Sequence, residues 1–139
     1  MEQTPIHYTG GCLCGALRYE LSGGLIDAGF CHCRMCQRAS GAPVVAWCTF
    51  PIEAFRYTGK APVVHSSSAR YQREFCGQCG TPIAFRRRAA ATLIDVTLAS
   101  LDTPEAIPPQ YHIWRMSQIK WFETTDRLPR HEDAGPDQE

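Results

Sequence analysis

Seven of the eight cysteines stand in short clusters, and their spacing is the first chemical signal in the sequence. The segment FCHCRMCQ holds a C-x-C-x-x-C triplet, made by Cys31, Cys33 and Cys36. A C-x-C pair lies before it and a C-x-x-C pair lies after it, at Cys12 and Cys14 and at Cys76 and Cys79. Clustered cysteines in a chain of 139 residues indicate a metal protein, since such a chain can build a core without a disulfide framework.

The seven clustered thiols divide as four plus three. Zinc prefers four tetrahedral ligands, so a four-cysteine set is closed and structural, whereas a three-cysteine set leaves one position for water or substrate. We expect the first set to be Cys12, Cys14, Cys76 and Cys79, because this grouping keeps the triplet whole. The spacing alone leaves an alternative open. In a zinc ribbon, the last two cysteines of the triplet would join the C-x-x-C pair and strand the other three.

The open fourth position is what would give the triplet a chemical role. Zinc with a free position can polarise an oxygen or sulfur, or lower the pKa of a bound thiol. A fourth protein ligand would close the site, and the candidates are His7, His32, His65, His112 and Cys48. His32 is pinned between two ligands and is poorly placed for the same ion. Cys48 lies in an apolar run and is expected to be a buried, inert thiol.

Short strands are expected to position these clusters. In residues 16–23, Leu17, Tyr19 and Leu21 alternate with polar side chains, the pattern of a half-buried strand. Further strand candidates are residues 43–50, 52–59, 70–75, 82–86, 92–101 and 111–116. The helical signal is confined to residues 33–40, and the proline-rich stretch 104–109 is typical of a loop. The class is therefore mainly β, either all-β or a β-rich α+β fold.

Length and composition predict one domain over residues 1–130, which its cysteine clusters would make zinc-bound and catalytic-type, followed by a polar flexible tail at 131–139. The 14 basic residues balance the 14 acidic ones, so no overall basic field attracts nucleic acid. No stretch approaches the roughly 20 apolar residues that span a membrane, and the first residues lack the pattern of a secretion signal. We therefore expect a cytoplasmic protein with no membrane partner. The sequence does not indicate an oligomeric state.

Several motifs together resemble those of the glutathione-dependent formaldehyde-activating enzyme family, which also contains centromere protein V. They are GGCLCGALRYEL, FCHCRMCQRASGAPVVAWCTF, FCGQCGTPIAF, VTLASLDTPE and the late HIW, and the resemblance runs over about residues 10–129. It implies a zinc-bound β-tent-like fold of short coiled antiparallel sheets with minimal helix, and two zinc ions per chain. Cys12, Cys14, Cys76 and Cys79 match the family's structural zinc ligands, and Cys31, Cys33 and Cys36 match the ligands of its catalytic-type zinc.

The resemblance also implies an activity. It is that of a zinc-dependent carbon–sulfur lyase acting on thiol–aldehyde adducts, and the family's named reaction forms S-hydroxymethylglutathione from formaldehyde and glutathione. A small thiol such as glutathione is then the expected partner. Arg34, Arg38, Arg70 and Arg73 lie near the cysteine clusters and are candidates for binding its carboxylates. The alternative is a non-catalytic zinc-bound β module that binds a protein or nucleic acid, with both metals contributing only to folding.

Overall fold

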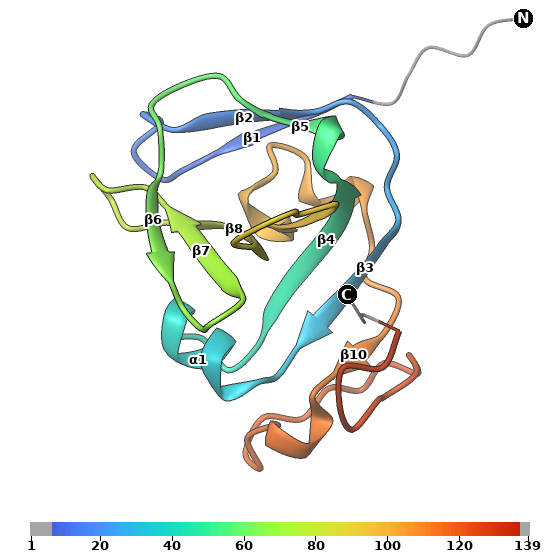
Figure 1. Cartoon of the computed structure of the whole chain (residues 1–139). Coiled ribbons are helices and arrows are strands. Elements are labelled where there is room, and N and C mark those ends of the chain that lie inside the picture. The colour runs from blue at the N-terminus through green and yellow to red at the C-terminus, as the bar shows by residue number, and fades with distance from the viewer. Residues whose placement is uncertain (1–6, 137–139) are drawn as a thin grey trace, which may run out of the picture.

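The computed structural model describes residues 7–136, and strands dominate this part of the chain (Figure 1). The strands form two sheets. The smaller sheet has the order β1-β2-β5, with β1 at Tyr8–Gly11, β2 at Arg18–Leu21 and β5 at Phe55–Tyr57. The larger sheet has the order β10-β3-β4-β9-β8-β7-β6. Its strands are β3 (Asp27–Cys31), β4 (Val45–Pro51), β6 (Val63–Ser66), β7 (Tyr71–Phe75), β8 (Pro82–Arg87), β9 (Leu93–Thr97) and β10 (His112–Ile113). The predicted mainly β class is confirmed.

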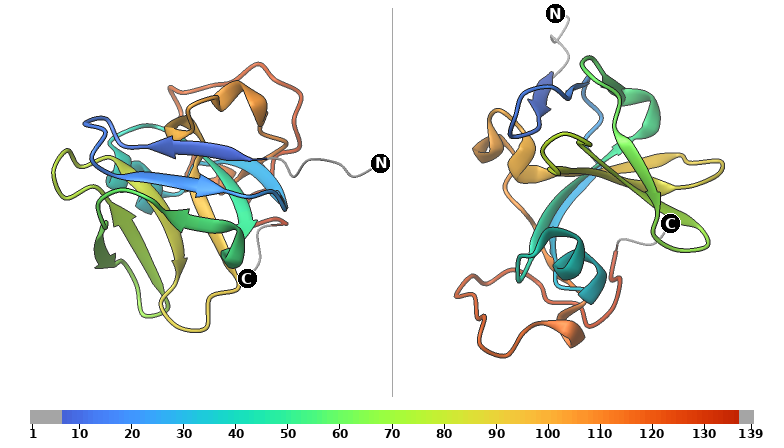
Figure 2. Two further views of the ribbon diagram at one scale, coloured as in Figure 1. Left: turned by 90° about the horizontal axis from the view of Figure 1, so that it is seen from above. Right: turned by 90° about the vertical axis from the view of Figure 1, so that its left-hand side faces the viewer.

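The two sheets enclose one main hydrophobic core, and Figure 2 shows β1 and β2 as a layer separate from the larger sheet. The alternation predicted for residues 16–23 is confirmed, since Leu17, Tyr19 and Leu21 are all fully buried. From the larger sheet, Phe50 and Cys48 of β4 are buried in the same core. Every strand pair is antiparallel except that of β10 with β3, which is parallel. The pleat of a strand turns alternate side chains to opposite faces, and β2 shows this with buried and half-buried residues in alternation.

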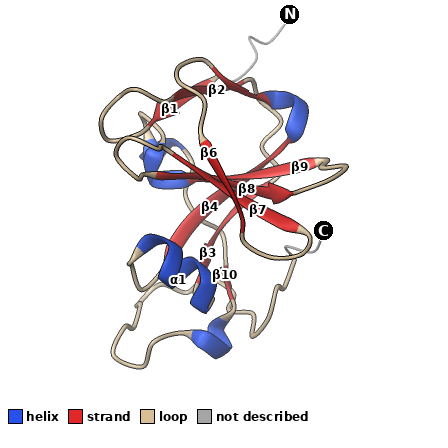
Figure 3. Ribbon diagram, turned by 60° about the vertical axis from the view of Figure 1, so that its left-hand side comes forward, coloured by secondary structure: helices blue, strands red, loops and turns tan. Residues whose placement is uncertain are grey.

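Helix is scarce in the described residues, as Figure 3 shows. The α-helix α1 covers Arg34–Ser40, close to the predicted 33–40. The side chain of Cys33 caps its first turn, and the helix ends at Gly41, whose φ of 72° is a left-handed conformation that glycine adopts without strain. The short 3₁₀ turns are Ile52–Ala54, Leu98–Ser100, Pro104–Ala106 and Arg115–Ser117.

The structure contains three strands that the sequence pattern did not predict, namely β1, β3 and β6. The sequence of β3, DAGFC, has no β-branched residue, and its Gly29 is required by packing because a Cβ there would collide with the ring of Tyr111. All four residues of β6 are exposed at the sheet edge, so this strand has no apolar alternation to detect. Tertiary packing and edge pairing, rather than local pattern, make these strands.

Some predicted strands are shorter than expected. The candidate at 52–59 begins as a 3₁₀ turn before β5, and the candidate at 92–101 leaves the sheet after Thr97. The candidate at 111–116 is reduced to the two residues of β10, because Trp114 takes a left-handed conformation with a φ of 58°. A side chain in that conformation interrupts the extended backbone that a strand requires.

The segment after β10 folds back along that strand (Figure 1). The backbone N–H of His112 donates to Pro129, that of His131 donates to His112, and that of Trp114 donates to Asp133, each at 2.9 Å. The predicted tail at 131–139 lies in part outside the described residues, and its extent and the single domain before it stay predictions. In the part of the chain that the structure describes, no helix is long and apolar enough to cross a membrane.

Candidate metal centres

The structure gathers the clustered cysteines into two groups, one of four and one of three. Within each group the sulfur atoms lie within 4.8 Å of one another. The first group is Cys12, Cys14, Cys76 and Cys79, and the second is Cys31, Cys33 and Cys36. The zinc-ribbon alternative would need the triplet beside the C-x-x-C pair, and the structure does not bring them into one group. Both groups have the composition and crowding of a metal site.

The four-cysteine group joins the two sheets. Cys12 and Cys14 lie in the turn between β1 and β2 of the small sheet, whereas Cys76 and Cys79 lie in the turn between β7 and β8 of the large one. The Sγ atom of Cys14 is 3.6 Å from that of Cys12 and 3.8 Å from that of Cys76. A tetrahedral zinc ion with metal–sulfur bonds of about 2.3 Å would set its sulfurs about 3.8 Å apart. The donor atoms therefore fit zinc.

Backbone and side-chain donors surround the four sulfurs. The N–H of Leu17 donates to Cys12 Sγ at 3.2 Å, and the N–H of Cys79 donates to Cys76 Sγ at 3.4 Å. The hydroxyl of Thr81 lies 3.2 Å from Cys79 Sγ, and hydrogen bonding there lowers the pKa of that thiol to about 5. Such donors stabilise thiolates, which are the form that binds a metal.

The triplet lies where β3 passes into α1. Cys31 is the last residue of β3, Cys33 caps the helix, and Cys36 lies in its first turn. The N–H of Cys36 donates to Cys33 Sγ at 3.3 Å, so the helix cap itself sets the spacing of these two sulfurs. Cys31 and Cys36 are each 5% exposed, whereas Cys33 is half-buried. The strand end and the helix start therefore orient the three thiols as one unit.

The three thiols of the triplet share protons unequally. Hydrogen bonds from Cys31 and Cys36 lower the pKa of Cys33 to about 2. The same contact, seen from its other partner, raises the pKa of Cys31. One thiolate is thus stabilised by its neighbours, and further negative charge at so crowded a site calls for a cation. A soft divalent ion such as zinc suits three sulfur donors.

Among the residues that the structure describes, no fourth protein ligand reaches the triplet. His7 and His65 are exposed, and Cys48 is fully buried in the core, where its thiol faces the carbonyl of Val96 at 3.5 Å. His32 and His112 are hydrogen-bonded to each other, Nε2 to Nδ1 at 2.8 Å, and neither belongs to the sulfur group. Among residues 7–136, none of the five candidates therefore closes the site.

A cavity of about 370 Å³ opens over the triplet, and all three of its cysteines line it. The walls are mainly apolar and aromatic, and they come from distant strands and from the residue after β10. The aromatic lining residues are Trp47, Tyr71, Phe85 and Trp114. The ring of Tyr71 stacks on that of Phe85, with centroids 4.9 Å apart. The site is therefore a sulfur cluster at the wall of an aromatic cavity, a common form of small-molecule site.

Arg73 of β7 brings positive charge to this cavity. Its guanidinium lies 5.0 Å from the ring centre of Phe85 and 6.0 Å from that of Trp47, which are cation–π distances. Its Nη2 lies 3.6 Å from Cys36 Sγ. The opposite charge nearby is Asp95 of β9, whose carboxylate accepts a hydrogen bond from Thr49. Arg73 can therefore offset negative charge on the triplet or on a ligand.

Two of the four arginines singled out from the sequence line the cavity, and two do not. Arg34 and Arg73 are lining residues, and Arg34 donates to Gln37 Oε1 at 2.6 Å. Arg38 and Arg70 are exposed and lie outside the lining. Sequence reasoning missed Tyr71, Phe85 and Asp95. The alternation of Tyr71 with Arg73 in β7 is a usable signal for the first, but only strand pairing sets Phe85 opposite Arg73.

Other hollows are less directly linked to the cysteines. One of about 450 Å³ shares Cys36, Trp47 and Arg73 with the first cavity and extends to Cys12. A polar hollow of about 690 Å³ lies along the segment 115–132 and has no cysteine in its described lining. Trp121 is 76% exposed and lines none of these three hollows. Of these three hollows, only the one over the triplet is lined by all three of its thiols.

Known proteins resemble this chain in sequence and in fold. Residues 7–117 match the model of a family described as glutathione-dependent formaldehyde-activating enzyme. An uncharacterized lyase of Schizosaccharomyces pombe is 32% identical over 85 residues, which cover 56% of this chain and 56% of the relative, so the chain spans little more than half of that protein. A crystal structure of a Rhodobacter sphaeroides protein has 27% identity and a TM-score of 0.55, over 68% of this chain and 87% of that one.

Proposed function

Because this chain belongs to the glutathione-dependent formaldehyde-activating enzyme family, we propose that it is a zinc-dependent carbon–sulfur lyase-type enzyme acting on thiol–aldehyde adducts. The proposal includes two zinc ions per chain. The four-cysteine group would hold a structural ion, and the triplet would hold the working one. One observation carries it, namely that the three sulfurs of the triplet line an aromatic cavity without a fourth described protein ligand.

The reaction is balanced without an oxidant or reductant. In the forward direction the thiol sulfur forms a bond to the aldehyde carbon, and the carbonyl π bond breaks. The thiol proton ends on the former carbonyl oxygen, so the product is an S-hydroxymethyl compound when the aldehyde is formaldehyde. The lyase direction is the reverse of these steps. A zinc ion at the triplet would supply a Lewis acid and a lower pKa for a thiol beside it.

The residues of the cavity would bind and orient the reactants. The walls formed by Trp47, Phe85 and Trp114 pack around the adduct and exclude water, which holds the two reacting atoms together. Arg73 lies beside Cys36. Its positive charge favours a thiol substrate that is negatively charged, either at the sulfur or at a carboxylate of the same molecule. Glutathione, named in the family description, is the first thiol to test. A reducing compartment such as the cytoplasm would keep all eight cysteines out of disulfides, so that seven of them can bind zinc.

The test is exchange spectroscopy, because the uncatalysed addition is already easy. ¹³C-formaldehyde is mixed with glutathione, and the exchange rate between free and adduct carbon is measured with and without the zinc-loaded protein. We expect acceleration by the wild type and by Cys48→Ala, whose site is in the core, but none by Cys36→Ser. Equal exchange rates with and without wild-type protein, across glutathione and other small thiols, would reject the lyase function. The non-catalytic zinc module would then be the better interpretation.

A further inference from the structure

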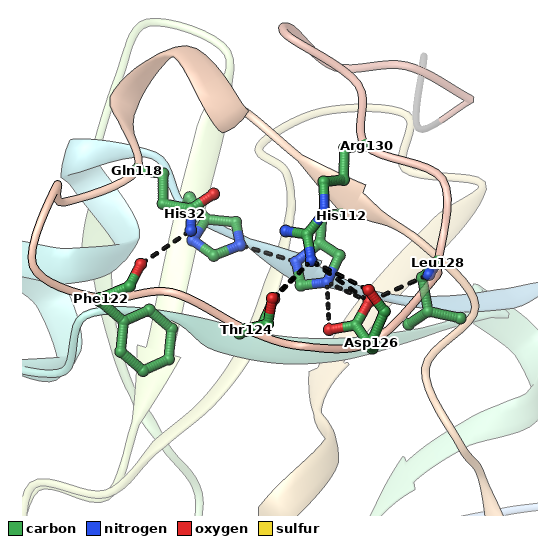
Figure 4. A network of polar contacts seen from close by, with 8 residues as sticks. All are labelled: His32, His112, Gln118, Phe122, Thr124, Asp126, Leu128 and Arg130. Carbon is green, nitrogen blue, oxygen red and sulfur yellow. Dashed lines mark hydrogen bonds and ion pairs between the residues drawn. The ribbon is translucent and has the colours of Figure 1, made fainter.

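Two histidines that the proposed chemistry does not use are brought together in the interior. His32 comes from the C-H-C of the triplet and His112 comes from the H-I-W motif, 80 positions later. Neither is exposed, and their rings stack with centroids 5.0 Å apart. His112 Nε2 is also 3.0 and 3.1 Å from the two carboxylate oxygens of Asp126. Figure 4 shows the resulting chain from Asp126 through His112 to His32.

The hydrogen bond at the Asp126 end of this series can run in one direction only. The ionised carboxylate of Asp126 only accepts, so His112 Nε2 carries a hydrogen and donates to it. The His112 Nδ1 and the His32 Nε2 then share one hydrogen between them. His32 Nδ1 has no partner among the described residues. His32 is therefore held through a single ring nitrogen, and the holder, His112, is itself oriented by Asp126.

This series of hydrogen bonds ends at the proposed metal-binding turn, Cys31–Cys33. Cys31 and Cys33 contribute their sulfurs to the triplet, whereas the ring of the intervening His32 is paired with His112. Buried Gln37 holds the same turn, since its Nε2 donates to the carbonyl of His32 at 2.8 Å and to that of Ser117 at 3.2 Å. His112 of β10 thus contacts the turn directly, and Ser117, in the segment after β10, is linked to it through Gln37.

Asp126, at the far end of this series, lies in a segment that has hydrogen bonds of its own. Asp126 accepts from the N–H of Leu128 at 3.0 Å and lies 3.5 Å from the guanidinium of Arg130. Arg130 in turn donates to the hydroxyl of Thr124 at 2.7 Å. The family model matches residues 7–117, so Asp126 and these supports lie beyond it. The match to the family model therefore does not cover this part of the chain.

We propose that Asp126 and His112 are positioning residues, which hold the Cys31–Cys33 turn in its metal-binding geometry through His32. The inference rests on the proposed metal at the triplet. Direct hydrogen-bond partners of metal ligands alter metal affinity by roughly 10- to 100-fold when they are removed, and Asp126 acts further out, through His112 and His32, so we expect the lower end of that range. Loss of Asp126 therefore speeds metal release from the triplet and leaves the four-cysteine site as it was, since that site lies between other strands.

The experiment measures zinc release to a chromophoric chelator from the full chain loaded with two zinc ions. Cys36→Ser identifies which release phase belongs to the triplet. In Asp126→Ala we expect that phase to be about tenfold faster, with the other phase and the urea midpoint unchanged. Asp126→Asn, whose amide oxygen can still accept from His112, restores most of the wild-type rate. Asp133→Ala is the matched control, because its carboxylate serves the N–H of Gly135 and does not touch His112.

His112→Phe is a second variant, since it keeps a stacked ring while removing both hydrogen bonds. We expect this variant to release zinc faster from the triplet alone. In ¹⁵N spectra, the ring of His32 should be in a single tautomer in the wild type and in a mixture of tautomers in Asp126→Ala. Unchanged release in Asp126→Ala overturns the inference alone. So does faster release from both sites with a lower urea midpoint, which marks a general structural role. A wild type that holds one zinc overturns the inference together with the proposed working metal.

Discussion

Arg73 and Cys36 are 37 positions apart in the sequence, yet the guanidinium Nη2 lies 3.6 Å from the thiol sulfur. Two aromatic rings hold the arginine there, because its guanidinium lies over both Phe85 and Trp47. Arginine, unlike lysine, carries a planar cation that stacks on rings and donates hydrogen bonds in fixed directions. The contact links the β7 strand to the triplet and sets a positive charge beside its sulfurs.

Replacing Arg73 tests that contact. In Arg73→Met we expect the dissociation constant for an anionic thiol such as glutathione to rise by about tenfold or more, since charge-assisted hydrogen bonds contribute about 1.5–3 kcal/mol. Arg73→Lys should recover only part of this, because it keeps the charge without the planar stack. NMR titration of the zinc-loaded protein measures the effect. Arg70→Met is the control, since Arg70 is exposed and outside the cavity. An equal effect in both variants would contradict a local role.

The two cysteine groups should differ in what their loss does to the fold. Cys76→Ser removes a sulfur that joins the two sheets, and we expect a large fall in melting temperature as well as the loss of one zinc. Cys36→Ser lies between a strand end and a short helix, so it should lose one zinc while the far-ultraviolet circular dichroism stays native. Elemental analysis and thermal melts measure both. Similar melting temperatures for the two variants would show that the four-cysteine group does not join the sheets energetically.

Cys48 should be inert in the native protein. Burial raises the pKa of its thiol to about 12, so only about one thiol in ten thousand is ionised at pH 8. We expect no alkylation of Cys48 by iodoacetamide in native protein and full alkylation after unfolding in urea. Mass spectrometry of peptides measures this, and the urea-unfolded sample is the control for the intrinsic reactivity of Cys48. Rapid native labelling of Cys48 would show that the core opens locally.

A buried acid on β7 should depend on the cation that β8 supplies. Glu74 is fully buried and is paired with Arg86, while Tyr57 donates to its other oxygen at 2.8 Å. Arg86→Met leaves this carboxylate without its cation, and we expect a loss of about 3 kcal/mol in the free energy of unfolding. Adding Glu74→Gln to that variant should recover part of the loss, because a neutral amide needs no cation.

Urea unfolding at saturating zinc measures the effect, and Arg87→Met on the same strand is the control for loss of a neighbouring arginine. A full recovery in the double variant would assign the whole cost to the unpaired charge. Equal destabilisation by Arg86→Met and Arg87→Met would mean that the buried pair has no special weight.

The sequence by itself determined the elements whose signal is local. The alternation of Leu17, Tyr19 and Leu21 predicts β2 and its buried face, because side chains on a strand alternate between faces. The C-x-C-x-x-C spacing keeps three thiols together on its own, since the chain is too short between them to separate. The capping position of Cys33 and the left-handed Gly41 likewise bound α1 from local chemistry alone.

Only the tertiary structure decided which distant groups meet. Which cysteines form the group of four is decided by two hairpin turns of different sheets that come together, and spacing left that choice open. The same holds for Phe85 beside Arg73 and for Asp126 behind His112, since strand register and the return of the last segment along β10 bring them into contact. Contacts between segments far apart in the chain depend on how the whole core packs, and no local pattern encodes that packing.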